Sequence, residues 1–150
     1  MIEEYNTGLS IIFLFKSDEK ELYQTVLSEK SGGRFRSSVS TSIPYSSDEL
    51  QPVGGISYTT ENDTGAFLSI VSNDEEVAYI EAGVGSNIER KKIKQGERIS
   101  FLFPFSEQIN FLYPTAYNKD GKKLYYYGYP KDTNVSISED LKWHSVDEQL

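Results

Sequence analysis

The chain has 150 residues but no cysteine, and only one histidine, one tryptophan and one methionine. The absence of cysteine excludes disulfides, thiol nucleophiles and thiolate metal sites. Zinc sites built from several His or Cys ligands are excluded too, because His144 is the only histidine. We therefore predict neither a metal nor a cofactor, and we interpret His144 as a partly exposed side chain of the terminal segment.

Long hydrophobic runs are also absent. The apolar run Ile11 to Phe15 has five residues, whereas a helix needs roughly 20 to cross a bilayer. We predict no transmembrane span in this chain, and no signal peptide pattern is visible at its start. If the natural protein is exported, we expect its targeting segment to have been removed.

Positive charge is scarce. The formal net charge is -8 and the isoelectric point is near 4.7, which argues against a nucleic-acid partner, because such binding depends on a positive surface. One basic cluster contains Arg90, Lys91 and Lys92. It is either a small patch for an anionic partner or a solvated edge strand, where lysine discourages pairing with other chains.

Aromatic side chains, by contrast, are abundant, with eleven Tyr and eight Phe. Short apolar runs alternate with turn residues along the chain, a pattern typical of all-β domains. We predict an all-β fold of roughly eight to ten strands, arranged as one antiparallel β-sandwich over residues 1–150. A β-barrel is the alternative, and we expect short helical turns at most. Residues 132–150 form a polar, acidic C-terminal segment.

The strongest local signal is a hairpin. Asp120 and Gly121 lie between two runs rich in aromatic and β-branched residues, 111–118 and 123–129. Both residue types tolerate the positive φ angles that a two-residue type I′ turn requires. We therefore predict that these two runs pair through such a turn.

No sequence motif for catalysis is present. The chain has no Gly-x-Ser-x-Gly elbow and no phosphate-binding loop. Carboxylates occur together in three expected turns, as Asp18 with Glu19, Glu61 with Asp63, and Asp74 with Glu75 and Glu76. Glycosidases need two facing carboxylates, so a carboxylate-based enzyme acting on glycans is kept as an alternative.

The best candidate for recognition is a row of tyrosines. On a strand, Tyr125, Tyr127 and Tyr129 share one face, and Leu124 and Tyr126 share the other. We place Leu124 and Tyr126 toward the core and the three tyrosines outward. Tyrosine has a flat apolar body and a polar tip, which suits sugars, peptides or proteins. Arg90, Lys91 and Lys92 form a secondary patch. Tyr113, Tyr117 and Trp143 extend the tyrosine surface if the fold brings them to the same face.

Four segments resemble parts of a group of uncharacterised, small, exported or lipid-anchored β-rich proteins of Gram-positive bacteria. They are Ser69–Asn73, Val77–Glu81, Ile88–Ile93 and the hairpin Ala116–Tyr125. The resemblance covers the last two-thirds of the chain and implies an extracytoplasmic β-rich domain whose lipid-anchoring cysteine was lost with a signal segment. No activity is carried by the resemblance, so no residue takes a role from it.

Together these observations predict a non-enzymatic binding or interaction module of the bacterial cell envelope. Its partner would be a protein, a peptide or a glycan. We expect the protein to lie outside the cytoplasm, anchored by a lipid on the segment that was removed. A cytoplasmic location is the alternative. The second alternative function is a self-associating intracellular or phage structural protein.

Overall fold

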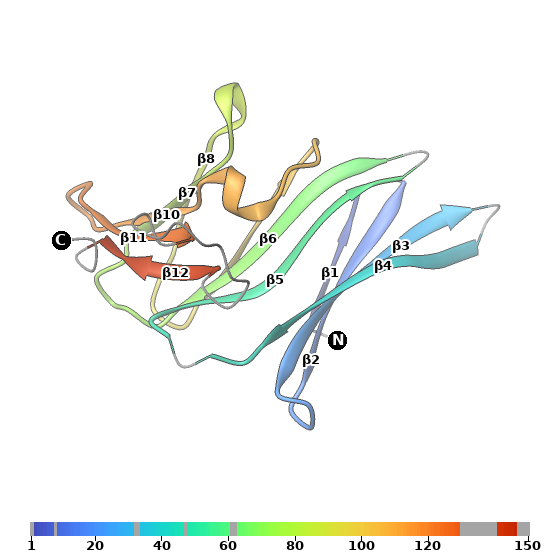
Figure 1. The fold of residues 1–150 in the computed structure, drawn as a ribbon, viewed down its shortest axis with the longest axis horizontal. Helices are drawn as coiled ribbons and strands as arrows, with labels where there is room; N and C mark the ends of the chain where they lie inside the picture. Colours follow the sequence, from blue (N-terminus) through green and yellow to red (C-terminus); the bar gives the residue numbers. More distant parts are fainter. Residues whose placement is uncertain are drawn as a thin grey trace.

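The computed structural model describes residues 2–7, 9–31, 34–46, 48–60, 63–129 and 141–146. In these ranges the chain forms twelve strands, β1 to β12, and two short 3-10 turns, η1 and η2. The strands make three open sheets of four, three and five strands, and every pairing is antiparallel. Figure 1 shows the three-stranded sheet passing between the other two.

The four-stranded sheet is a meander of consecutive strands. Its strands, in spatial order, are β1 (Glu3–Asn6), β2 (Ser10–Ser17), β3 (Leu22–Ser31) and β4 (Arg34–Pro44). Along β2, Ile12 and Leu14 are fully buried while the alternate residues are partly exposed. This alternation turns one face of the sheet inward.

The three-stranded sheet is the middle layer. Its order is β5 (Leu50–Thr59), β6 (Thr64–Ser72) and β9 (Arg98–Phe103). On β6, Phe67 enters a core shared with the four-stranded sheet, while Leu68 and Ile70 enter a larger core on the other side. Because β6 is buried on both faces, its apolar residues run together instead of alternating.

The five-stranded sheet covers the larger core. Its order is β12 (Lys142–Ser145), β11 (Lys123–Gly128), β10 (Thr115–Tyr117), β7 (Tyr79–Ala82) and β8 (Glu89–Lys92). Two 3-10 turns, η1 (Gly85–Asn87) and η2 (Ile109–Leu112), lie in the connections near it. Ile80, Ala116 and Trp143 point from this sheet into the larger core.

Strand β5 approaches the inner face of the four-stranded sheet closely. The Gly55 amide donates to Thr25 Oγ1 at 3.3 Å, and Thr41 Oγ1 donates to the Gly55 carbonyl at 2.5 Å. A Cβ on Gly54 would lie 2.9 Å from Leu14 Cδ1. The two layers can therefore meet only because residue 54 has no side chain.

The all-β sandwich is confirmed, and the sheets described remain open, unlike the barrel alternative. The predicted hairpin also forms, but its turn type is wrong. Gly121 has a positive φ of 86° and Asp120 does not, so the loop is not type I′. Instead the Gly121 amide donates to the Asn118 carbonyl at 3.1 Å, and Asn118 Oδ1 accepts from the amides of Asp120 and Lys122. The Asn118 side chain thus stabilises a longer loop.

The predicted strand 111–118 is shorter than expected, because η2 ends at Leu112 and β10 begins at Thr115. Within the acidic segment 132–150, the structure describes only residues 141–146, which contain edge strand β12. The single-domain assignment stays a prediction.

Candidate functional site

The five-stranded sheet has an outer face that points away from the larger core. Cross-strand pairing arranges its side chains in two rows. Residues opposite each other on neighbouring strands point to the same face, so the rows can be read from the register. The first row is Arg90, Glu81, Thr115, Tyr126 and His144, and the second is Lys92, Tyr79, Tyr117 and Lys123.

A stacked cluster occupies the part of this face formed by β7, β8 and β10. The rings of Tyr79 and Tyr117 stack with centroids 5.0 Å apart and planes 15° apart. The guanidinium of Arg90 lies 4.4 Å from the centroid of the Tyr79 ring. Arg90 also donates to Glu81 Oε2 from Nη2 at 2.9 Å and from Nε at 3.2 Å. We call these four residues the tyrosine–arginine stack.

The electrostatics of the stack follow from these contacts. The hydrogen bond to Glu81 raises the pKa of the Arg90 guanidinium, so its charge is fixed. Burial raises the pKa of the Tyr117 hydroxyl, and the carboxylate of Glu81 adds to that effect. The phenol therefore stays protonated near neutral pH and can donate a hydrogen bond.

Beside the stack the surface is hollowed. The hollow has a volume of about 240 Å³. Its wall includes Glu81 from β7, Thr115 and Tyr117 from β10, Lys123 from β11, and Ile88 and Tyr113 from the adjoining loops. We call this feature the tyrosine hollow. It combines a carboxylate, an ammonium group, hydroxyls and apolar side chains within one small depression.

Two loops hold the rim of the hollow in place. The Gly83 amide donates to the Leu112 carbonyl at 2.8 Å and joins the end of β7 to η2. Gly83 has a φ of +127° and no room for a Cβ, which would collide with the carbonyl oxygen of Asn87. Tyr113 has left-handed backbone angles, φ 50° and ψ 51°, a rare conformation for a residue with a side chain.

The rim displays two large apolar side chains to solvent. Tyr113 is 66% exposed and Ile88 is 54% exposed. Thr115 Oγ1 donates to the Tyr113 carbonyl at 2.9 Å and helps to hold the unusual backbone. Residues with strained backbone angles often occur at functional sites, so the rim is the part of this surface best suited to contact a ligand.

The structure corrects the orientation of the predicted tyrosine row. Tyr125 and Tyr127 do not face outward: both pack against the larger core, and Tyr127 meets Trp143 edge-on at 5.8 Å. Tyr126, predicted inward, is on the outer face and stacks on His144 at 5.4 Å. Tyr129 is partly buried just after β11. Alternation correctly separated Tyr126 from Tyr125 and Tyr127, but Leu124, grouped with Tyr126, lies on the same core as Tyr125, and side-chain type did not reveal which face was covered.

Tyr125 is partly buried, and its hydroxyl and its ring have different partners. The hydroxyl donates to Asp74 Oδ2 at 2.8 Å, while the ring packs against the core. Burial, followed by the bond to this carboxylate, raises the pKa of Tyr125. Leu124 packs against the same core, as predicted. A β-bulge beside it shifts the register between β10 and β11, which lets adjacent residues contact one core.

The predicted basic patch is divided between two faces. Arg90 and Lys92 are on the outer face, whereas Lys91 points the other way, lies 5.3 Å from the Phe101 ring and donates to the Ser100 carbonyl. Strand β8 is an edge of its sheet. Arg90 therefore joins the tyrosine–arginine stack, Lys92 lies on the same outer face opposite Tyr79, and Lys91 connects the outer sheet to the middle one.

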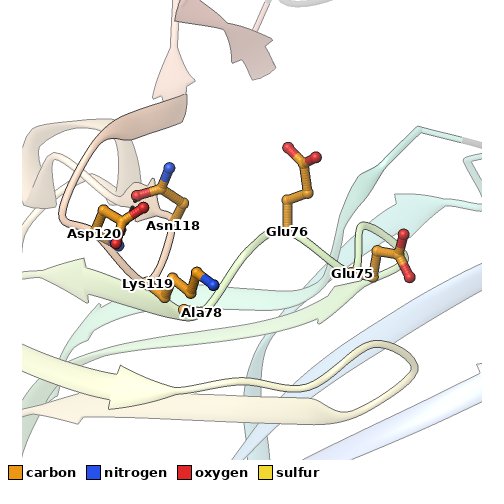
Figure 2. Close-up of a pocket in the computed structure, with 6 residues that line it drawn as sticks. All are labelled: Glu75, Glu76, Ala78, Asn118, Lys119 and Asp120. Atoms are coloured by element: carbon orange, nitrogen blue, oxygen red, sulfur yellow. Dashed lines mark hydrogen bonds between the residues drawn. The ribbon is translucent and has the colours of Figure 1, made fainter.

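A larger depression, of about 500 Å³, lies between the β10–β11 turn and the loop before β7. Figure 2 shows Asn118, Lys119 and Asp120 on the turn, with the carboxylates of Glu75 and Glu76 apart from them and not directed to one point. Among the described residues, no group of three or more His, Asp or Glu side chains could hold a metal ion. The residues that line this depression belong to two turns with solvated polar side chains.

Two of the carboxylate groups considered for glycoside hydrolysis, at Asp63 and at Asp74, lie at opposite ends of β6, and Glu61 lies outside the described residues. Asp63 precedes β6 and accepts from Thr7 Oγ1 at 2.8 Å, whereas Asp74 follows β6 and binds Tyr125. A strand of nine residues spans roughly 30 Å, beyond the 5–10 Å that the chemistry needs. His144, expected to be partly exposed, is instead 6% exposed.

Sequence reasoning missed most of the site. The unrecognised residues are Tyr79, Glu81, Ile88, Thr115 and Lys123, whereas Tyr113 and Tyr117 were expected only as an extension of the tyrosine row. The short alternation in 79–82 could have placed Tyr79 and Glu81 on a solvent face. No local signal pairs β7 with β10, because the two strands are more than 30 residues apart.

Among the described residues, no helix has the length and apolar character required to cross a membrane. Comparisons with family models, curated proteins and solved structures found no match to this chain.

Proposed function

We propose that this protein is a non-enzymatic binding module that acts outside the cytoplasm, at the bacterial cell envelope. Its recognition surface is the outer face of the five-stranded sheet, centred on the tyrosine–arginine stack and the tyrosine hollow. The observation that supports this most is the rim, where Ile88 and Tyr113 are exposed beside fixed polar groups. Exposed aromatic residues around a hollow are typical of recognition surfaces.

Packing explains why this face suits recognition. The inner face of the same sheet is occupied by the larger core, which includes Ile80, Ala116 and Trp143. The outer side chains are therefore held on a rigid sheet, and the stack orders two of them further. A preorganised surface loses less conformational entropy on binding.

Binding is tested by co-sedimentation of the purified protein with envelope fragments from a Gram-positive bacterium. The variant carries Ile88→Ala together with Tyr113→Ala, two exposed positions whose truncation leaves the core intact. Phe111→Ala is the matched control, because Phe111 is 45% exposed on η2 but does not line the hollow. We expect the double variant to lose at least nine-tenths of the sedimented fraction and the control to retain it. Equal binding by all three proteins would place the recognition surface elsewhere.

The location is tested separately. The resemblance of four segments to exported proteins supports it, and the mass of the natural protein in separated membrane and cytosolic fractions measures it directly. A processed or lipid-bearing N-terminus in the membrane fraction is the expected result. A cytosolic form that starts at Met1 would contradict the envelope location.

Self-association is a second candidate function, favoured by a different surface. Ile11, Phe13 and Phe15 of β2 are partly exposed on the face opposite the buried Ile12 and Leu14. The rings of Phe13 and Phe15 have centroids 6.1 Å apart. Sedimentation velocity over a hundredfold range of protein concentration tests it, with Phe13→Ser as the variant expected to prevent any concentration-dependent association.

A further inference from the structure

We propose that the tyrosine hollow binds one neutral sugar ring of a glycan. This inference rests on the proposed function and names its ligand class. Four features support it: the charge of the hollow, its apolar rim, its size and its position on the face of the sheet.

The carboxylate of the hollow is paired with Arg90, and the exposed ammonium of Lys123 contributes one solvated positive charge. Glu81 is held by two hydrogen bonds from Arg90, at 2.9 and 3.2 Å. A carboxylate paired in this way is a weak attractor for a cation, yet its remaining lone pairs can still accept hydrogen bonds. The hydroxyls of Tyr117 and Thr115 and the ammonium of Lys123 supply polar groups nearby. Because an exposed ammonium is screened by solvent, it attracts a charged ligand weakly, and the set suits a ligand with many hydroxyls and no charge.

The rim provides apolar contact. Tyr113 and Ile88 are large, exposed and on the same depression. A pyranose ring has faces made of C–H groups and an edge made of hydroxyls, so it can pack on these side chains while its edge meets the polar wall. The electron-rich face of the tyrosine ring attracts the positively polarised C–H groups.

Size limits the ligand to a small unit. The hollow has a volume of about 240 Å³, less than the roughly 300–1,000 Å³ typical of sites for drug-sized molecules. One sugar ring, at the end of a chain or within it, matches this space better than a long ligand does.

Position disfavours an extended peptide. Such peptides often add a strand to a free sheet edge, but the hollow opens on the face of the sheet. The nearest edge is β8, whose sequence Glu89 to Lys92 is charged throughout. Charged edge strands resist the addition of a further strand.

The test is a titration of isotope-labelled protein, followed by amide chemical shifts. The probes are maltotriose, cellotriose and the trimer of N-acetylglucosamine, with a set of unmodified octapeptides as the other ligand class. We expect one of the sugars to shift the amides of Ile88, Tyr113 and Lys123. Tyr113→Ala should weaken its Kd at least tenfold, and Phe111→Ala should change it less than twofold.

Two further variants separate stacking from hydrogen bonding. Tyr113→Phe retains the ring and should keep the Kd within threefold, whereas Glu81→Gln should weaken binding about fivefold while the amide spectrum shows an intact fold. If peptides alone shift the amides of the hollow, the sugar inference is overturned and the binding module remains. If no probe shifts them, the sugar inference falls, and the co-sedimentation result alone decides the proposed function.

Discussion

Gly54→Ala tests the close packing of the middle layer against the four-stranded sheet. A methyl group at this position would lie 2.9 Å from Leu14 Cδ1, 3.0 Å from Thr25 Oγ1 and 3.2 Å from Phe67 Cε1. All three distances are shorter than ordinary van der Waals contacts between heavy atoms. Leu14 and Phe67 are fully buried and have little room to move.

The magnitude follows from three contributions. Overpacking a core typically costs about 1–3 kcal/mol. Rotation of Thr25 would also weaken the hydrogen bond that it accepts from the Gly55 amide, worth about 1 kcal/mol. The lower entropy of alanine in the unfolded chain offsets about 0.5–1 kcal/mol. We expect a net loss of about 1–3 kcal/mol in the free energy of unfolding.

Gly55→Ala is the matched control. Its added methyl would find its nearest neighbours at 3.6 and 3.8 Å, which are ordinary contacts, so its stability should stay within about 0.5 kcal/mol of the wild type or rise. Urea unfolding measures both. At an m value of about 2 kcal/mol/M, a loss of 2 kcal/mol lowers the midpoint by about 1 M. Equal midpoints for the two variants would refute the packing of β5 on the four-stranded sheet.

Three other substitutions test other parts of the structure. Gly83→Ala places a Cβ against the carbonyl oxygen of Asn87 at a φ of +127°; we expect a loss of at least about 2 kcal/mol, measured by urea unfolding. Tyr125→Phe removes the bond to Asp74 and should cost about 1–2 kcal/mol in the same assay; an unchanged midpoint would contradict it. Burial raises the pKa of Tyr58 from 10.0 to about 12, so the folded state keeps a proton that the unfolded chain loses. This contribution to the free energy of unfolding is complete below pH 10 and is lost between about pH 10 and 12. The free energy of unfolding of Tyr58→Phe should therefore fall less between pH 9 and 12 than that of the wild type.

The outer face shows where local patterns stop being informative. Alternation in Lys123–Gly128 correctly put Tyr125 and Tyr127 on one side and Tyr126 on the other. The choice of the inner side depended on Trp143, which pairs with Tyr127 across β11 and β12. Side-chain type pointed to the wrong face, because a tyrosine can bury its ring and still satisfy its hydroxyl at the surface, as Tyr125 does with Asp74.

The basic cluster gives a related lesson. Three consecutive basic residues look like one patch in sequence, yet a strand directs neighbours to opposite faces. Arg90 therefore stacks on Tyr79, and Lys91 contacts Phe101 in the interior. The identity of each neighbour depends on strands that are distant along the chain.

The amino-acid sequence by itself determined the all-β class, the hairpin around Gly121 and the separation of Tyr126 from Tyr125 and Tyr127, because turn chemistry and side-chain alternation act over a few residues. Only the tertiary structure decided that β6 serves two cores, that Gly54 is a point of close approach, and that Tyr79 meets Tyr117. These features depend on contacts between segments far apart in the chain, such as β7 with β10. Such pairings are chosen by packing of the whole core, which no local pattern encodes.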